Sequence, residues 1–536
     1  MALLFCIPCP LPNHPICVTL LLSIIWLLLG STAATGSSSR RGHETDQLAL
    51  FAIKAKITRD PFQATSLWNR SVNHCRWYGV VCGRRHQRVI ALHLNSLQLA
   101  GYLSPHIGNM SFLRIISIHN NSFGGQIPQE IGRLSRLQIM HLENNSFTGE
   151  IPGNISNCLR LMHLGLGGNG LVGKLPSHFG ISLLKLQGIT LYSNNLTGKI
   201  PSSFGNFSML KILNAKYNSF EGSIPNSFGH LKSLIHLQLG INNLSGIIPP
   251  SIYNLSSIVT FSLPVNRIRG GLPRNLGLTL PNLQVFNIHT NQFSGILPAS
   301  LSNASNLLAL FVARNKFTGD MPSLAGSPSL HELAVHVNHL GNGDDNDLNF
   351  LYSIANCSNL EYLSLSDNNF YGMLPKSIGN FSMNLRTIGL GRNQLFGSLP
   401  SEIGNLLILE TLGLETNLLT GSIPPAISGL GNLRDLYLNS NNFSGEIPSS
   451  LGNLTLLDTL VLDSNSLQGS IPSSLGNCQQ LSTLLLSENN LGGAIPKEVM
   501  NLSSLSIILA LSQNHLIGSL PLEVGSLSNL GYPRHL

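Results

Sequence analysis

The amino-acid sequence repeats the pattern L-x-L-x-x-N-x-L-x-G-x-I-P from Leu92 to Pro521, in steps of 23 to 25 residues with one step of 30. The asparagine column of this pattern defines 18 repeats, the first of which carries Leu97 in that column. Glycine stands four residues after the column in 17 repeats, and proline stands seven residues after it in 16. Self-similarity over such a length indicates a repeat architecture, so we expect residues 91–530 to form one array.

The residue types of the pattern predict how each repeat folds. The alternating leucines share one face of a short strand. Strands of successive repeats must stack in parallel, because one repeat cannot bury its own apolar face. The column asparagine can bond the backbone of its own and adjacent loops, the glycine permits a special turn, and the proline fixes φ where the chain reverses. The pattern therefore predicts an α/β solenoid with a parallel sheet on its concave face and 3-10 helices and loops on its convex face.

The N-terminal residues 1–35 are predicted to be a cleaved signal peptide. The apolar run from Val18 to Gly30 has 13 residues, and about 20 are needed to span a bilayer. A small–x–small sequence, Ser31-Thr32-Ala33, follows it. Residues 1–17 contain no Lys or Arg, so an uncleaved signal anchor remains the alternative.

The eight cysteines fall into three groups. Cys6, Cys9 and Cys17 belong to the predicted signal peptide. Cys75 and Cys82 form a short pair, which in a secreted chain suggests a disulfide. The other three, Cys158, Cys357 and Cys478, occupy one position in distant repeats, so they are predicted to be buried apolar residues.

Basic charge is concentrated at one end of the chain. Residues 40–90 hold ten Lys or Arg and three Asp or Glu, and the remaining residues hold 21 of each kind. A nucleic-acid-binding protein should carry its basic residues along the binding surface, so no nucleic-acid partner is expected. A solvated cap explains the excess, and contact with an acidic membrane or wall surface is the alternative.

Charged residues make up only 10% of the chain, so glycans would contribute to its solubility. The sequence contains 15 N-x-S/T sequons, and we expect many of them to be glycosylated. They are Asn69, Asn109, Asn120, Asn144, Asn154, Asn195, Asn206, Asn243, Asn254, Asn303, Asn356, Asn380, Asn442, Asn453 and Asn501.

No enzyme motif agrees with the repeat frame. The G-x-G-x-x-G match at 165–170 lies on a repeat strand without a βαβ unit, and the phosphate-loop match at 168–174 lacks its Ser or Thr. His331 and His336 are five residues apart on a strand, whereas the metalloprotease motif needs four on a helix. The sequence therefore predicts no enzyme, no cofactor and no metal site.

The 30-residue step contains an insertion at 340–357 with three aspartates, Asp344, Asp345 and Asp347. A calcium loop of the EF-hand type would need a glycine and a glutamate that are missing here. A surface turn is the favoured interpretation, with Asp347 capping a short helix.

The N-x-L-x-G-x-I-P half of each repeat resembles the plant-specific class of leucine-rich repeats, which implies a superhelix with an extra short strand on one flank. Residues 45–82 resemble the N-terminal cap of plant receptor kinases, which implies a helical cap over 36–90, a Cys75–Cys82 bridge and a packed Trp77. The insertion resembles that of the subfamily containing immune receptors. Residues 531–536 leave the repeat pattern, and no transmembrane helix or kinase precedes Leu536, so a truncated ectodomain is expected.

The concave face of a solenoid is an extended surface that is available for binding. Its outward positions are expected two, four and six residues before each column, and aromatic residues and arginine are frequent interface anchors. The candidate ligand-binding residues are Tyr192, Lys216, His236, Gln238, His289, Phe311, Arg314, His336 and Tyr437. An acidic stretch with Glu415, Asp435 and Asp463 follows, so an extended peptide with an apolar anchor and a basic end is the expected ligand. The histidines suggest pH-dependent binding.

Together these features predict an extracellular recognition scaffold without a kinase of its own. It would act in plant defence or development, in the apoplast, or at the cell surface if a full-length form carries a transmembrane helix. Its partners would be a peptide or protein ligand and a membrane receptor kinase as co-receptor. The alternative is a secreted inhibitor of cell-wall-degrading enzymes, similar to polygalacturonase inhibitors, although 18 repeats exceed the length of that family.

Overall fold

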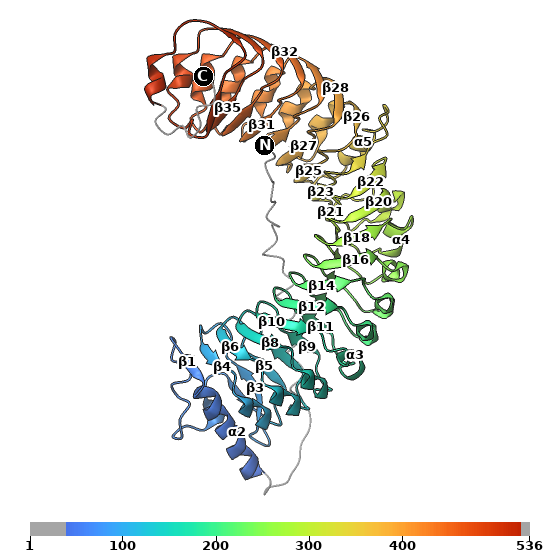
Figure 1. Ribbon diagram of the computed structural model, residues 1–536, viewed down its shortest axis with the longest axis vertical. Coiled ribbons are helices and arrows are strands. Elements are labelled where there is room, and N and C mark those ends of the chain that lie inside the picture. Colours follow the sequence, from blue (N-terminus) through green and yellow to red (C-terminus); the bar gives the residue numbers. More distant parts are fainter. Residues whose placement is uncertain (1–38, 527–536) are drawn as a thin grey trace.

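The computed structural model describes residues 39–526, and the predicted signal peptide and the 531–536 tail lie outside these residues. The chain forms an open arc (Figure 1), with one long sheet along its inner side and short helices along its outer side. The predicted leucine-rich-repeat solenoid is thereby confirmed. None of the helices in the described part has the length and apolar character needed to cross a membrane.

The inner sheet has one parallel strand for each repeat, and each strand pairs with those of the two adjacent repeats. Its strands are β3 (Val89–His93), β5 (Ile115–Ser117), β7 (Ile139–His141), β9 (His163–Gly165), β11 (Gly188–Thr190), β13 (Ile212–Asn214), β15 (His236–Gln238), β17 (Thr260–Ser262), β19 (Val285–Asn287), β21 (Ala309–Phe311), β23 (Glu332–Ala334), β25 (Tyr362–Ser364), β27 (Thr387–Gly389), β29 (Thr411–Gly413), β31 (Asp435–Tyr437), β33 (Thr459–Val461), β35 (Thr483–Leu485) and β37 (Ile508–Ala510).

A second set of strands follows the column asparagine of each repeat and forms the flank that the plant-type pattern implied. The first run comprises β4 (Ala100–Tyr102), β6 (Ser122–Gln126), β8 (Ser146–Glu150), β10 (Gly170–Lys174), β12 (Asn195–Lys199), β14 (Ser219–Gly222), β16 (Asn243–Ile247), β18 (Arg267–Gly270), β20 (Gln292–Ile296), β22 (Lys316–Gly319) and β24 (His339–Leu340). The second run comprises β26 (Tyr371–Met373), β28 (Gln394–Ser398), β30 (Leu418–Gly421), β32 (Asn442–Glu446), β34 (Ser466–Ser470), β36 (Asn490–Gly493) and β38 (His515–Leu516).

The outer side is built from single turns of helix that begin just after the proline of most repeats. The 3-10 helices are η3 (Pro105–Asn109), η4 (Gln129–Arg133), η5 (Gly153–Asn157), η6 (Ser202–Asn206), η7 (Asn226–His230), η8 (Pro250–Asn254), η9 (Ala299–Asn303), η10 (Lys376–Asn380), η11 (Ser401–Asn405), η12 (Pro425–Gly429), η13 (Ser449–Asn453), η14 (Ser473–Asn477) and η15 (Leu522–Ser526). Short α-helices replace them at α3 (Phe179–Ser182), α4 (Leu276–Thr279), α5 (Phe350–Ile354) and α6 (Lys497–Met500).

The N-terminal cap closes the first edge of both sheets. It consists of α2 (Ser39–Lys54), β1 (Ile57–Arg59), η2 (His74–Arg76) and β2 (Val80–Cys82), and β1 and β2 pair antiparallel with β4 and β3. The Cys75–Cys82 disulfide is confirmed, with Cα atoms 5.4 Å apart. Trp77 is buried and stacks on Trp68. The antiparallel strands therefore cover edges that would otherwise be open to pairing with another chain.

A continuous apolar core fills the space between the inner sheet and the outer helices. Its members are mainly the pattern leucines, isoleucines and phenylalanines of every repeat, most of them fully buried. Cys158, Cys357 and Cys478 are free thiols buried in this core, as the repeat frame predicted. Burial raises the pKa of the Cys158 thiol to about 12, so it is an inert packing residue rather than a reactive nucleophile.

The insertion interrupts the flank strands between β24 and β26. The prediction that Asp347 caps the following helix is wrong, because α5 begins at Phe350 and has no side-chain cap. The buried Asp347 carboxylate instead accepts hydrogen bonds from the backbone N–H groups of Asn342, Gly343 and Tyr371, at 2.8, 2.9 and 3.1 Å. It thus ties the inserted loop to the flank of the next repeat.

Each column asparagine, from Asn121 to Asn514, joins two consecutive repeats in the way the pattern predicted. Asn441 is representative: its Nδ2 donates to the carbonyls of Leu414, Leu438 and Asn439 at 2.9 to 3.2 Å. Its Oδ1 accepts the Leu419 N–H at 3.1 Å. One buried amide therefore satisfies four backbone groups where the strand turns toward the flank.

Replacing Asn441 by alanine should destabilise its own repeat and the preceding one. Each backbone group left buried without a partner costs about 1–3 kcal/mol. We expect Asn441→Ala to lower the melting temperature and to accelerate amide hydrogen exchange in residues 411–446. Asn432→Ala, at an exposed asparagine nine residues earlier, is the control and should change neither. Equal effects of the two substitutions would contradict this assignment.

Candidate ligand-binding face

The nine candidate residues all lie on the strands of the inner sheet or within three residues of their ends. Eight of their side chains are half-buried, and that of Arg314 is exposed. The structure separates them into three groups along the arc. The first lies over β11, β13 and β15, the second over β19, β21 and β23, and the third consists of Tyr437 on β31.

In the first group, a glycine makes room for an aromatic ring. A Cβ atom at Gly167 would lie 2.4 Å from the ring of Tyr192, so the ring occupies the place of a side chain there. The Tyr192 hydroxyl donates to Asn144 Oδ1 at 3.0 Å, two repeats back. Next along the sheet, a hydrogen bond of 3.1 Å joins His236 Nδ1 to Thr260 Oγ1. Lys216 follows β13, between these two contacts, and Gln238 lies on β15 together with His236.

The second group combines two histidines, one aromatic ring and one arginine on three adjacent strands. Phe311 is paired across the sheet with Asn287 and Ala334, two residues before His289 and His336 respectively. Burial lowers the pKa of His336 to about 4, and the positive charge of Arg314 and the neighbouring His289 act in the same direction. Burial and Arg314 also lower the pKa of His289. Both rings are therefore neutral at neutral pH.

Arg314 lies in a different backbone position from the other candidates. It directly precedes Asn315 and has a φ of 54°, as does its counterpart in nearly every repeat. Its side chain therefore projects from the turn after the strand instead of from the strand. The outward position of that repeat, two before the column, is the buried Ala313.

Tyr437 lies apart from the other candidates, beside the acidic stretch. Burial raises the pKa of Glu415, Asp435 and Asp463. Glu415 Oε2 and Asp463 Oδ1 are buried and have no hydrogen-bond partner among the described residues. Thr411 Oγ1 donates to Asp435 Oδ2 at 3.1 Å. The charges of Arg392 and Arg434 lower the pKa of Glu415 and Asp435 in part, but none of the ion pairs among the described residues includes these carboxyl groups. A positive group placed here would therefore be bound favourably.

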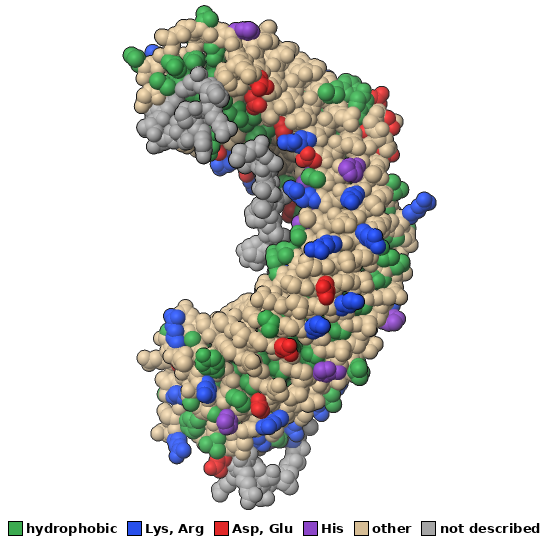
Figure 2. Space-filling view, viewed as in Figure 1, with side chains coloured by type: hydrophobic (Ala, Val, Ile, Leu, Met, Phe, Trp, Pro, Cys, Tyr) green, Lys and Arg blue, Asp and Glu red, His purple; other side chains and the backbone are tan. Residues whose placement is uncertain are grey.

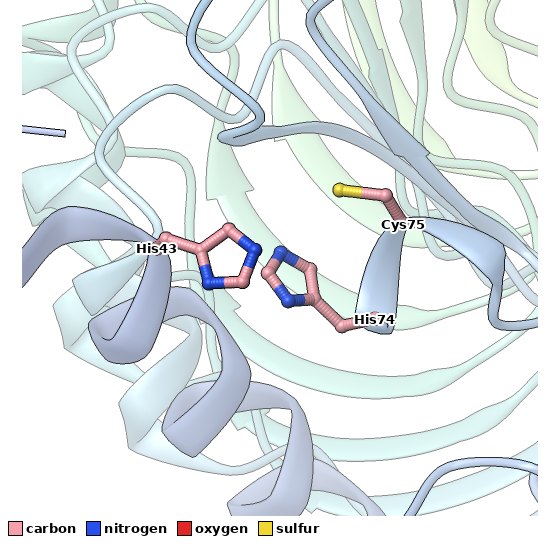
Figure 3. Close-up of side chains that lie close together, drawn as sticks. All are labelled: His43, His74 and Cys75. Atoms are coloured by element: carbon pink, nitrogen blue, oxygen red, sulfur yellow. The ribbon is translucent and has the colours of Figure 1, made fainter. Parts of the chain in front are cut away.

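Among the polar residues that the candidate set missed, at outward positions near the N-terminal end, are His119, His141 and Glu143. They lie two, four and two residues before their columns, so the same frame could have identified them. Another group of possible metal ligands occurs in the cap, where Figure 3 shows His43, His74 and Cys75 close together. The Cys75 sulfur is bonded to Cys82 and is no thiolate ligand there.

Fourteen of the fifteen sequon asparagines are exposed, and Asn109 is half-buried. They are spread over the cap, the flank strands and the outer helices. Figure 2 shows only scattered charged side chains on the visible face, as the low charge content implies. Glycosylation of these asparagines remains a prediction, consistent with their exposure.

Comparisons with known proteins agree with this architecture. Residues 43–83 match the leucine-rich repeat N-terminal domain. The leucine-rich repeat family matches ten segments between residues 112 and 478. Among solved structures, the Arabidopsis receptor kinase HAESA in complex with the peptide hormone IDA and the co-receptor SERK1 is 30% identical, with a TM-score of 0.74, over 92% of this chain and 89% of that chain. The GASSHO1/SCHENGEN3 ectodomain from Arabidopsis thaliana, in complex with CASPARIAN STRIP INTEGRITY FACTOR 2, is 32% identical with a TM-score of 0.73, over 90% of this chain and 63% of that chain.

Two curated relatives are receptor kinases from plants. The chain is 43% identical over 89 residues to the receptor-like kinase EFR of Arabidopsis thaliana and 41% identical over 90 residues to the receptor kinase-like protein Xa21 of Oryza sativa subsp. japonica. Each alignment covers 16% of this chain and 9% of the relative. The fold and these matches define a leucine-rich-repeat solenoid. The chain belongs to the leucine-rich-repeat family, and its relatives are the plant leucine-rich-repeat receptor kinases.

The lowered pKa of His336 predicts a pH-dependent stability. An unfolded histidine has a pKa near 6.5, whereas folded His336 titrates near 4, so below pH 6.5 the unfolded chain binds more protons and stability falls with pH. Arg314 and His289 contribute to the shift, and Ser364 Oγ lies 3.0 Å from His336 Nδ1. We expect the melting temperature of His336→Gln to fall less than that of the wild type when the pH is lowered from 6.5 to 4. His230→Gln, at an exposed histidine on η7, should behave as the wild type does. If the melting temperature of His336→Gln fell as much as that of the wild type, the lowered pKa of His336 would be refuted.

Proposed function

We propose that this chain is the ligand-recognition part of an extracellular plant receptor system. It would bind an extended peptide, or an extended segment of a protein, along its inner sheet, in the apoplast or at the cell surface. The proposal rests on the face itself, where a histidine, phenylalanine and arginine patch is followed by two carboxyl groups, Glu415 and Asp463, that each keep one buried oxygen without a hydrogen-bond partner among the described residues. A solved relative of the same architecture, HAESA, binds the peptide hormone IDA together with the co-receptor SERK1.

The chemistry of the two groups suggests the polarity of the ligand. The patch around Phe311 offers an apolar surface and a positive guanidinium, which suits an apolar side chain and a ligand carboxylate. Farther along the arc, the carboxyl groups of Glu415, Asp435 and Asp463 suit lysine or arginine. A ligand with an apolar anchor and a basic end therefore fits this order of groups. We propose a membrane receptor kinase as the co-receptor, since HAESA forms its peptide complex with a co-receptor.

The inner face can be tested with a library of random peptides displayed on phage, selected against the secreted protein. We expect selected peptides to carry an apolar residue and a basic end. Alanine at Tyr192, Phe311 or Arg314 should weaken their binding at least tenfold, because each change removes contact area or charge from the patch. Leu407→Ala, at an exposed residue after the outer helix η11, is the control and should leave affinity unchanged.

The acidic stretch is tested separately by the isosteric changes Glu415→Gln and Asp463→Asn. They should reduce the preference for a basic end without affecting the apolar anchor. Binding that survives all five substitutions would place the ligand elsewhere. If the immobilised protein captured and inhibited purified polygalacturonase, with no peptide selected, the inhibitor function would replace this proposal.

A further inference from the structure

Two histidines and one glutamate converge on the inner sheet near its N-terminal end. His141 is the last residue of β7, Glu143 follows it by two residues, and His119 follows the neighbouring strand β5 by two. One ligand atom from each of the three residues lies within 4.8 Å of the other two. None of these residues belongs to the three groups of the candidate ligand-binding face.

The glutamate of this cluster is half-buried, and one of its two carboxylate oxygens lacks a hydrogen-bond partner among the described residues. Glu143 Oε1 accepts a hydrogen bond of 3.2 Å from Thr190 Oγ1, whereas Oε2 is buried and has no hydrogen-bond partner among the described residues. None of the ion pairs found in the described part of the chain includes Glu143. A buried carboxylate without a positive partner is costly, so a bound cation would stabilise this arrangement.

The space for this carboxylate is built into the backbone of the next repeat. A Cβ atom at Gly165 would lie 1.8 Å from Glu143 Oε1, so only glycine at that strand position leaves room for the carboxylate. Thr190, one further repeat along, fixes one oxygen. Three successive repeats therefore hold Glu143 over the sheet.

The histidines are suited to act as metal ligands. A hydrogen bond of 3.1 Å joins His119 Nδ1 to Ser117 Oγ, which orients the ring and leaves Nε2 available. Such a contact to the second nitrogen is typical of metal-bound histidines. Burial lowers the pKa of His141 and His119, so both imidazoles are neutral, as coordination requires, at neutral pH.

We propose that His119, His141 and Glu143 form a binding site for a divalent transition-metal ion with the preferences of Zn²⁺. Two imidazoles and one carboxylate form the donor set of three-ligand zinc sites, which leave one position for water or another ligand. With metal–ligand bonds of about 2.0–2.2 Å, tetrahedral donor atoms lie roughly 3.3–3.6 Å apart. The ligand atoms now lie within 4.8 Å of one another. Small rotations of the three side chains, which move these atoms by about an ångström, bring them to the tetrahedral distance.

The site belongs to a longer row of histidines on successive repeats. The His141 ring lies 6.0 Å from that of His119 and 6.5 Å from that of His163, measured between ring centroids. The carboxylate distinguishes the site within this row, since Glu143 is the acidic member of the cluster. His163 is a neighbour of the site and is left out of the three-ligand set.

The proposal can be tested by titrating ZnCl₂ into the secreted full chain by isothermal calorimetry, after chelator treatment and dialysis. We expect one ion to bind per chain. His119→Gln, His141→Gln and Glu143→Gln should each weaken binding at least tenfold, whereas His230→Gln on the outer helix η7 and His163→Gln should not. Melting temperatures without metal, compared with the wild type, show that each variant is folded.

A spectroscopic measurement tests the coordination itself. Co²⁺ added in place of Zn²⁺ should give the strong visible absorption of a four- or five-coordinate site, and Glu143→Gln should abolish it. Absence of zinc binding in the wild type would overturn the proposal. Binding that survives the three cluster variants but is lost in His43→Gln would also overturn it, because the ion would then lie in the cap. Neither measurement uses a peptide, so failure here is distinct from failure of the proposed function.

Discussion

The side-chain amide of the column asparagine is the interaction on which the rest of the structure depends. Through Nδ2 it holds carbonyl groups of its own repeat and of the preceding one, and through Oδ1 it holds an N–H group of the preceding flank. Because this bonding recurs in every repeat from Asn121 to Asn514, the strands keep a common register along the arc. The side chains at the outward positions of the inner sheet take no part in this bonding, so they can differ from repeat to repeat.

The fold was predictable because its determinants are local and recur in each repeat. The pattern leucines, the glycine and the proline predicted strand, turn and outer helix, and most repeats have all three; the repeat of Asn315 has no helix between β22 and β23. Asp347 shows where this reasoning stops. Its partner on β26 is the Tyr371 N–H, 24 residues away, and the inserted loop is outside the repeat frame. No periodic rule could therefore tell a helix cap from a link between two repeats.

The candidate site was predictable in part, for a related reason. Counting back from the column placed eight of the nine candidates on the inner strands or within two residues of their ends, but it treated each repeat alone. The surroundings of a side chain there come from adjacent repeats: Tyr192 covers Gly167, and Glu143 covers Gly165. The sequence shows that Gly165 and Gly167 have no side chains above the sheet. Only the stacked structure shows that Glu143 and Tyr192, from the adjacent repeats, fill the space over these two glycines. The cluster of His119, His141 and Glu143 was overlooked in the same way.

The distribution of charge then separates carboxylates that are paired within the fold from carboxylates that are not. Asp46 is fully buried, but it pairs with Arg88 at 2.8 Å and accepts the Val89 N–H, so its charge is neutralised within the cap. Glu143, Glu415 and Asp463 are also largely removed from water, and each keeps a buried oxygen without a partner. All three lie two residues before a column asparagine, on the inner face. Burial there raises the pKa of each carboxyl group, and a raised pKa means that the carboxylate form is held at a cost in free energy. A cation that binds beside any of these groups recovers that cost, whether it is a metal ion near β7 or a basic side chain near β29 to β33. The free energy that burial of these carboxylates costs the free protein would therefore contribute to the binding of a positively charged ligand.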